Sequence, residues 1–356
     1  KKAKKVEDRL EPHEVFSAMP PVESLKALVS HMMTEQVDPD GDSLVMAVFD
    51  VSRAHFNAEA ERELYANLPE EMAEEGFCAK LNRTMYGTQD AARLWGELWA
   101  SHLELKFEYI IGKSSRALFS NRYTRGLCHG DDFGVVASLK NIEKFKKALE
   151  EVFEIKQVGL IGFDSHLDKE VKILNRIVRV NTSEDRMEIE ADTKHVEMIL
   201  EELEMKTCKQ IGTPRDKDDL GGDKDEKLVA AEATRFRSCL MRLSYLSQDR
   251  VDLSESVKIL ARSMANPTTK AMSGLKRAAR YLKGKQRCVL LYPRQSAKDA
   301  AVMVFTDSDW AGDKGSRKST SGMAVLRGRH LLRHSSTMQS VITLSSCEAE
   351  YYAMTK

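Results

Sequence analysis

Three aspartates stand where a metal ion could be held. Asp50 ends the apolar run 43–49, and Asp131 and Asp132 follow a glycine within a second apolar stretch, 126–137. Carboxylate oxygens are the ligands that Mg²⁺ prefers. If the two stretches are neighbouring strands, the acids could hold two ions about 4 Å apart, as in nucleotidyl transfer. Gly-Asp-Asp is also ordinary turn chemistry, so the spacing alone leaves both interpretations open.

The elements around these acids predict an α+β chain. The run 43–50 predicts a buried strand that delivers Asp50 at its end. Because Gly130 and the two acids interrupt 126–137, this stretch predicts a hairpin with a tight acidic tip. Helical periodicity is expected at 22–33, 91–105, 142–153 and 194–205, and further strands at 117–119, 171–180 and 187–189.

The second half of the chain begins after a polar segment. Residues 215–227 (RDKDDLGGDKDEK) contain one apolar residue and a Gly-Gly pair, which predicts a solvated linker. Helices are expected at 233–265, with an interruption near 248–252, and at 273–283; a strand at 302–307, a hairpin at 322–332 and a helix at 346–354 follow. The predicted domains are 1–215, a linker at 216–227, a helical part at 228–299 and a last part at 300–356.

Composition is that of a globular protein. The chain has 356 residues, of which 42% are hydrophobic, and 55 Lys+Arg balance 55 Asp+Glu. No run approaches the roughly 18 apolar residues of a membrane span, and six scattered cysteines form neither a zinc motif nor a disulfide framework. The charges are segregated: residues 57–76 hold seven glutamates and one arginine, whereas 270–287 hold seven basic residues and no acid. A polyanionic partner is therefore not excluded.

Several blocks resemble, in order, those of copia-type retrotransposon reverse transcriptases. The segment FDVSRAHFN (49–57) resembles their first catalytic block, NRTMYGTQDAARLW (82–95) is similar to L-Y-G-L-K-Q-A-P-R-x-W, and CHGDD (128–132) stands where they carry Y-V-D-D. Later segments at 264–268 and 275–284 are similar to NPT…LKRxLRYLKG, and those at 306–313, 317–322 and 344–351 resemble the opening of the ribonuclease H domain. The chain is identified as a fragment of a copia-type Pol polyprotein, with matches from about residue 12 to 354.

The resemblance implies a fold and an activity. The fold would be a reverse-transcriptase palm with a helical thumb or connection, followed by an incomplete ribonuclease H-like α/β domain. The activity would be that of an RNA-directed DNA polymerase using two Mg²⁺ or Mn²⁺ ions, a template–primer and deoxynucleoside triphosphates. Other Pol domains would belong to a longer polyprotein, without a membrane, in a cytoplasmic particle or the nucleus.

Site residues follow from the same blocks. Asp50, Asp131 and Asp132 match the metal-binding carboxylates of the palm. His55 stands where the family has an aromatic gate against the ribose 2′-OH. Asp90 replaces a glutamine that positions the incoming nucleotide. The remaining substrate-binding candidate is Arg93.

In the ribonuclease H portion Asp307 matches the first metal ligand, and Glu348 and Glu350 compete for the second. Ser345-x-x-Glu348 forms a capping box, which gives Glu348 a structural role. The family also places its ligand directly before the residue matching Tyr351, so we predict Glu350. We expect the remaining nuclease carboxylates to lie beyond the end of the chain, the nuclease half to be inactive, and the sheet to have an aggregation-prone open edge.

A basic helix face offers contacts to phosphates. Lys276, Arg277, Arg280 and Lys283 recur at i, i+1, i+4 and i+7, which brings them near one face. Such a face can neutralise backbone phosphates without reading sequence, although a solvated helix surface has the same pattern.

Departures from the family blocks define an alternative function. Gly130 should loosen the hairpin tip, and an added acid at Asp90 should repel triphosphate. Most of the family's fingers region is expected to be missing. The alternative is a catalytically degenerate remnant that at most binds nucleic acid. A third hypothesis, an unrelated protein with chance acidic turns, requires Asp50 to lie away from the Asp131-Asp132 tip.

Overall fold

The computed structural model describes residues 11, 15–215 and 225–355. The chain divides into two compact units, residues 1–174 and 175–356. Most of the linker predicted at 215–227 lies outside the described residues.

The first unit is built on a six-stranded antiparallel sheet in the order β4-β5-β6-β7-β1-β8. Its strands are β1 (Leu44–Val51), β4 (Ile110–Ile111), β5 (Leu118–Ser120), β6 (Arg125–His129), β7 (Asp132–Ser138) and β8 (Ile155–Ile161). The strand predicted at 43–50 and the hairpin predicted at 126–137 are confirmed as β1 and as β6 with β7. They lie side by side at the centre of the sheet, because β1 pairs with β7.

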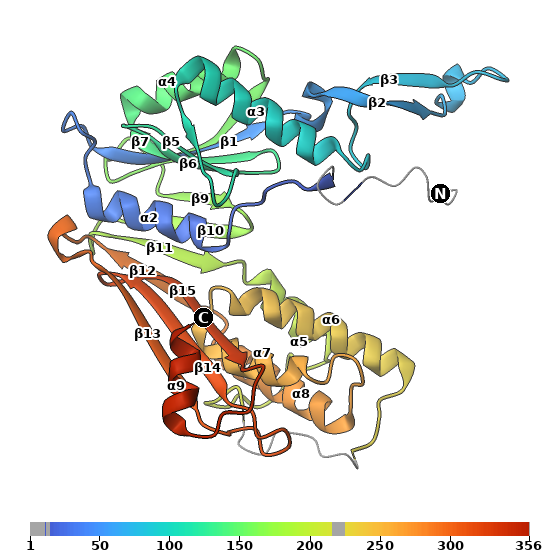
Figure 1. Ribbon diagram of the computed structural model, residues 1–356, viewed down its shortest axis with the longest axis vertical. Helices are drawn as coiled ribbons and strands as arrows, with labels where there is room; N and C mark the ends of the chain where they lie inside the picture. Colours follow the sequence, from blue (N-terminus) through green and yellow to red (C-terminus); the bar gives the residue numbers. More distant parts are fainter. Residues whose placement is uncertain (1–10, 12–14, 216–224, 356) are drawn as a thin grey trace. The chain divides into compact units, whose positions relative to one another are not determined.

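Helices cover both faces of this sheet. Figure 1 shows α3 (Ala91–Phe107) and α4 (Leu139–Glu150) over one face and α2 (Glu23–Glu35) against the other. The helix expected at 142–153 begins three residues earlier, directly after β7, and ends at Glu150. Each helix buries an apolar stripe, which supplies most of its stability.

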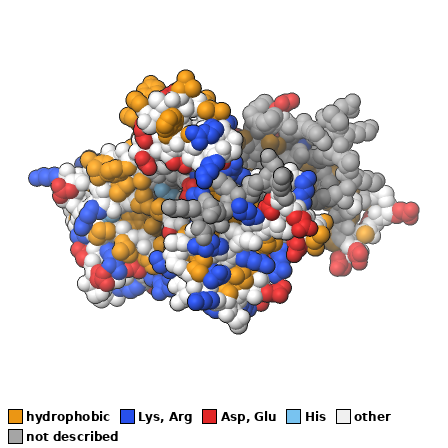
Figure 2. Space-filling model, turned by 90° about the horizontal axis from the view of Figure 1, so that it is seen from below, with side chains coloured by type: hydrophobic (Ala, Val, Ile, Leu, Met, Phe, Trp, Pro, Cys, Tyr) orange, Lys and Arg blue, Asp and Glu red, His pale blue; other side chains and the backbone are white. Residues whose placement is uncertain are grey.

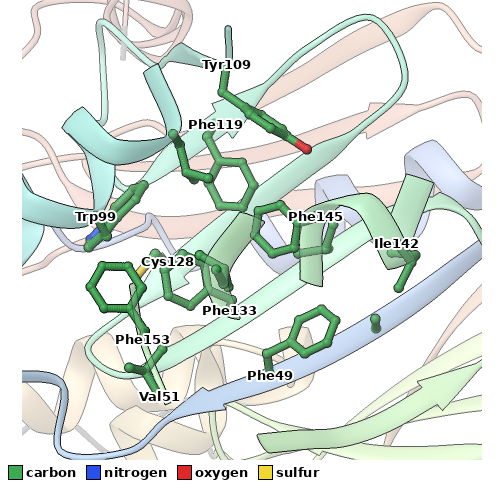
Figure 3. Close-up of a cluster of buried hydrophobic side chains, with 14 of the residues drawn as sticks. Phe49, Val51, Trp99, Tyr109, Phe119, Cys128, Phe133, Ile142, Phe145 and Phe153 are labelled. Carbon is green, nitrogen blue, oxygen red and sulfur yellow. The ribbon is translucent and has the colours of Figure 1, made fainter. Parts of the chain in front are cut away.

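The core between the sheet, α3 and α4 is rich in aromatic side chains (Figure 3). Phe119 and Phe145 stack with ring centroids 5.3 Å apart, and Trp99 meets Phe133 edge-on at 5.5 Å. Because side chains alternate along a strand, Phe49 and Phe133 enter this core while their neighbours Asp50 and Asp132 face the other side of the sheet.

The acidic segment 57–76 contains a strand that the sequence pattern did not predict. β2 (Glu59–Ala66) pairs with β3 (Ala79–Arg83) in a two-stranded hairpin that projects from the sheet (Figure 1). Its glutamates occupy the alternate, exposed positions of β2. The alternation of glutamates with Ala60, Arg62 and Leu64 was the available signal, but small and charged residues at the inner positions make only a weak apolar stripe. A short 3₁₀ helix, η3 (Glu70–Met72), lies in the connection.

The second unit combines a sheet with a helical bundle. β12 (Val289–Pro293), β11 (Arg186–Ala191) and β10 (Arg176–Asn181) are antiparallel neighbours. The helices, with the short 3₁₀ segments η4 and η5, are α5 (Lys194–Glu202), α6 (Ala230–Ser247), η4 (Val251–Leu253), α7 (Ser254–Ala261), α8 (Thr269–Gly284) and η5 (Ala297–Asp299). The prediction of one continuous strand at 171–180 is wrong, because two strands occupy this stretch. β9 (Glu170–Ile173) and β10 separate at Leu174 and Asn175, whose φ angles of 51° and 56° turn the chain.

The last part of the chain forms a three-stranded antiparallel sheet with one helix. β13 (Val302–Asp309), β14 (Thr320–Arg327) and β15 (His330–Met338) follow in that order, and α9 (Ser346–Met354) packs on β13 and β14. Among the described residues β13 pairs with β14 alone, and its Val302, Val304 and Phe305 are exposed. An open strand edge can pair with another chain, so aggregation through β13 stays a prediction. None of the helices in the described part of the chain has the length and hydropathy that a membrane crossing requires.

Candidate metal-binding active site

The three predicted palm aspartates come together. Asp50 on β1 lies directly opposite Asp132 on β7, and opposed residues of an antiparallel pair point to the same face with Cβ atoms about 5 Å apart. Asp131 precedes Asp132 in the turn, and carboxylate oxygens of all three lie within 4.8 Å of one another. This proximity rules out the hypothesis that the acids are unrelated turn residues on separate sides of the fold.

The electrostatics of this cluster favour a cation. All three aspartates are partly buried. Burial raises the pKa of Asp132, and the charges of Asp131 and Asp50 raise it further, against a small opposing effect of His129. Grouped carboxylate oxygens are the donor set that hard divalent ions prefer, and a bound dication would offset their mutual repulsion. The residues present therefore fit a divalent metal ion.

The turn that carries the acids is held from two directions. Gly130 adopts a left-handed φ of 64°, which glycine tolerates without strain. The indole Nε1 of Trp95 donates to the Gly130 carbonyl at 2.7 Å. The backbone N–H of Val51 donates to the Asp131 carbonyl at 3.0 Å. The loosening expected from Gly130 is therefore opposed by contacts from α3 and β1.

An aromatic pair borders the acids. His55 lies in the 3₁₀ helix η2 (Ala54–Asn57), and its ring stacks on Tyr86 with centroids 4.4 Å apart at 27°. Both line a cavity of about 210 Å³ together with Trp95 and Asp131. Burial lowers the pKa of His55, and Asp131 opposes that shift. Sequence reasoning assigned no role to Tyr86. Its position in the block 82–95 was the signal that could have marked it as a residue near the site.

Asp90 makes an ion pair rather than standing as an isolated acid. It is 1% exposed at the start of α3, and its carboxylate accepts from Arg62 Nε at 2.8 Å and Nη2 at 3.1 Å. The hydrogen bond from Arg62 is the main cause that lowers the pKa of Asp90. Arg62, which sequence reasoning missed, is therefore the partner of this acid. The repulsion of triphosphate expected from Asp90 stays a prediction. Arg93 pairs with Glu61 at 2.6 Å and Glu97 at 3.0 Å.

Of the two acids predicted in the last part of the chain, Glu350 contacts the residue that follows Asp307. Asp307 is exposed on β13. Glu350 on α9 accepts hydrogen bonds from the backbone N–H of the next residue, Ser308, at 3.1 Å and from its hydroxyl at 2.9 Å. Glu348 instead accepts from the N–H of Leu344 at 2.7 Å.

The start of α9 has the predicted cap. The N–H of Glu348 donates to the Ser345 hydroxyl at 3.1 Å. The cap predicted at Ser345 is therefore confirmed, and the Glu348 carboxylate turns back to the backbone at the helix start, at Leu344.

The basic residues of α8 lie on its outer side, opposite the buried Leu275 and Leu282. Lys276 is exposed and Lys283 partly exposed. The two arginines of this face are bonded to the segment 209–213, which follows α5. Arg277 donates to the Thr213 hydroxyl at 3.0 Å and Arg280 to the Lys209 carbonyl at 2.8 Å. On the face of the molecule in Figure 2, Lys and Arg side chains lie among acidic and hydrophobic ones.

The sheet, its flanking helices and the acids at the tip of its central hairpin are the arrangement of a nucleic-acid polymerase palm. The family model described as "Reverse transcriptase (RNA-dependent DNA polymerase)" matches residues 10–216. The chain therefore belongs to the reverse transcriptase family.

Known proteins extend the similarity beyond the palm. The chain is 26% identical over 366 residues to the retrovirus-related Pol polyprotein from transposon TNT 1-94 of Nicotiana tabacum, covering 96% of this chain and 25% of that protein. It is 26% identical over 311 residues to the Pol polyprotein from transposon RE2 of Arabidopsis thaliana, covering 85% of this chain and 20% of that protein. The resemblance to copia-type Pol polyproteins is confirmed, and the chain spans a quarter or less of the length of these two relatives.

A solved structure supports the fold. The foamy viral protease–reverse transcriptase in complex with an RNA/DNA hybrid superposes with a TM-score of 0.52 over 95% of this chain and 38% of that one, at 12% identity. The likeness establishes a mixed helix-and-sheet reverse transcriptase fold.

Proposed function

We propose that this chain is the polymerase part of a retrotransposon Pol polyprotein and extends a primer with deoxynucleotides on an RNA or DNA template. The observation that carries the proposal is the convergence of Asp50, Asp131 and Asp132 within 4.8 Å in a member of the reverse transcriptase family. The RNA/DNA hybrid bound by the foamy viral relative supports a template–primer as the partner, and an intracellular location follows for such an enzyme.

The proposed cofactor is a pair of Mg²⁺ or Mn²⁺ ions. Asp50, Asp131 and Asp132 would hold them through carboxylate oxygens. When bound, the ions would activate the attacking primer oxygen and neutralise charge on the leaving pyrophosphate. The β1–β7 register fixes two of the ligands relative to one another, and the contacts at Gly130 and Asp131 orient the third.

The proposed nucleotide site lies beside these acids. The stacked His55 and Tyr86 rings border the same cavity as Asp131, and a flat aromatic wall suits a sugar or base. Imidazole is smaller and more polar than the phenyl ring of the family's gate, so discrimination against ribonucleotides should be weaker. Asp90 and Arg93 would act indirectly, because both are engaged with residues of β2.

Residues 300–356 are proposed to be the N-terminal part of a ribonuclease H domain, with Asp307 and Glu350 as metal ligands. Support comes from the position of Glu350 against Ser308, the neighbour of Asp307. The basic face of α8 is proposed to contact phosphates of the template–primer. Its most exposed member is Lys276.

Primer extension tests the polymerase. We expect metal-dependent extension by the unaltered chain and a loss of at least about 100-fold in Asp131→Asn, as for removal of a principal electrostatic group. Asp164→Asn, an exposed acid of the same unit, is the matched control and should retain activity. Nucleic-acid binding without extension, unchanged by Asp131→Asn, would instead favour the degenerate remnant, and the absence of both binding and extension would contradict both functions.

A further inference from the structure

We infer that Trp95 is a positioning residue for the metal-binding acids, because its buried indole N–H fixes the turn on which Asp131 and Asp132 stand. The inference deepens the proposed polymerase function and rests on it for its catalytic meaning. We assign Trp95 no metal-ligand role; its indole N–H acts through the backbone carbonyl of Gly130.

The contact between Trp95 and Gly130 is a short hydrogen bond from a buried indole. Trp95 is 2% exposed, and its Nε1 lies 2.7 Å from the Gly130 oxygen. Phe153 meets the indole edge-on with centroids 4.9 Å apart. Because the indole is buried, its N–H would be left without this acceptor at a cost if the hydrogen bond to Gly130 were lost. The carbonyl of Gly130 is thereby tied to the rigid helix α3.

The turn needs this attachment because its own backbone is permissive. Gly130 and Asp131 connect β6 to β7. Apart from its two chain neighbours, no atom in the described part of the chain lies within 4 Å of the position that a Gly130 Cβ would take. The Cys128 thiol, at 3.5 Å, adds only a weak hydrogen bond to the Gly130 carbonyl. Val51 holds the Asp131 carbonyl. Consequently one carbonyl of the turn is fixed by β1 and the other by α3.

A neighbouring tryptophan separates positioning from simple packing. Trp99 lies one turn further along α3, is 4% exposed, and meets Phe119 and Phe133 edge-on in the same core. Its indole N–H makes no hydrogen bond with any of the residues that the structure describes. Trp99→Phe therefore removes comparable aromatic volume without freeing the turn.

The experiment compares Trp95→Phe with Trp99→Phe in the full chain. Hydrogen exchange of the peptide covering 128–133 and affinity for Mn²⁺ alone are measured, beside thermal unfolding. We expect similar losses of stability, but at least about threefold faster exchange of this peptide and about three- to tenfold weaker Mn²⁺ binding only in Trp95→Phe. Equal exchange rates and equal Mn²⁺ affinities in the two variants would overturn the inference.

Two additions keep the outcome decisive. If Trp95→Phe fails to fold, benzothienylalanine at position 95 keeps the shape of indole and removes its N–H, and the same differences are expected. In primer extension the positioning role predicts a lower kcat with an unchanged KM for template–primer. Failure of the unaltered chain to extend primers would refute the proposed function, whereas the exchange comparison would still decide the role of Trp95.

Discussion

Arg62 on β2 and Asp90 at the start of α3 form a two-point ion pair, with N–O distances of 2.8 and 3.1 Å. The pair joins the acidic hairpin to the helix that also carries Trp95. At the base of the same hairpin, the Thr84 hydroxyl donates to the carbonyl of His55. The hairpin is thus bonded both to the start of α3, through Asp90, and to the 3₁₀ helix that carries His55.

Removing Arg62 should destabilise the first unit. Arg62→Gln leaves the buried Asp90 carboxylate without its main partner, and we expect a loss of about 1–3 kcal/mol in the free energy of unfolding at pH 7. Because the pair lowers the pKa of Asp90, its stabilisation is present above the unfolded-state pKa and is lost as the pH falls below it. Urea unfolding at several pH values measures both effects. Lys80→Gln, which breaks the exposed pair with Glu63, is the control, and an equal loss there would contradict the prediction.

Asp132→Asn should stabilise the metal-free protein. The raised pKa of Asp132 means that its ionised form is disfavoured in the fold, so stability falls as the pH rises from the unfolded-state pKa to the folded-state pKa. Relief of the cost of burying the charge and of the repulsion from Asp131 and Asp50 should add about 0.2–1 kcal/mol at pH 7 in EDTA and little at pH 3. Thermal unfolding with added Mg²⁺ should reverse the order, since the variant loses a ligand. A variant less stable in EDTA would argue against repulsion.

Acid should remove the stabilisation that Asp313 provides. Burial acts to raise its pKa, but hydrogen bonds from Ser316 and Arg262 outweigh this and hold the pKa of Asp313 at about 2. Asp313→Asn should therefore cost about 1–2 kcal/mol near neutral pH, allowing for solvent screening. The difference should disappear as the pH falls from about 4 to about 2. Denaturant titrations of both proteins across this range check it, and a pH-independent difference would show that charge is not the cause.

His55→Phe should sharpen the choice between deoxynucleotides and ribonucleotides. The larger apolar ring beside Tyr86 leaves less room and no polar partner for a 2′-hydroxyl. We expect about a tenfold fall in the relative kcat/KM for ribonucleotides, with deoxynucleotide incorporation retained. Single-nucleotide incorporation measures the ratio, and an unchanged ratio would remove His55 from the sugar site.

Lys276→Gln should weaken nucleic-acid binding uniformly across sequences. Loss of one phosphate contact lowers the slope of log affinity against log salt by about one. Fluorescence anisotropy with a primer–template duplex at several salt concentrations gives the slope. Lys144→Gln, an exposed lysine on α4, serves as the control, and equal slopes for all three proteins would place the phosphate contacts elsewhere.

Local patterns in the sequence were sufficient to define the central elements and the acids. β1, the β6–β7 hairpin and the capped α9 were predictable because each is encoded by neighbouring residues: an apolar run, a glycine-containing tip and Ser345 with Glu348. The blocks 49–57, 82–95 and 128–132, taken in order, also identified the family that the match to residues 10–216 establishes.

Only the tertiary structure decided how distant residues pair. Arg62 meets Asp90 across 28 positions and Trp95 meets Gly130 across 35. Neither contact has a local signature, because each depends on which faces α3 presents to β2 and to the β6–β7 turn. Packing, rather than propensity, sets such distances. For the same reason β2 was not predicted: its strand conformation depends on pairing with β3, which its own acidic sequence does not indicate.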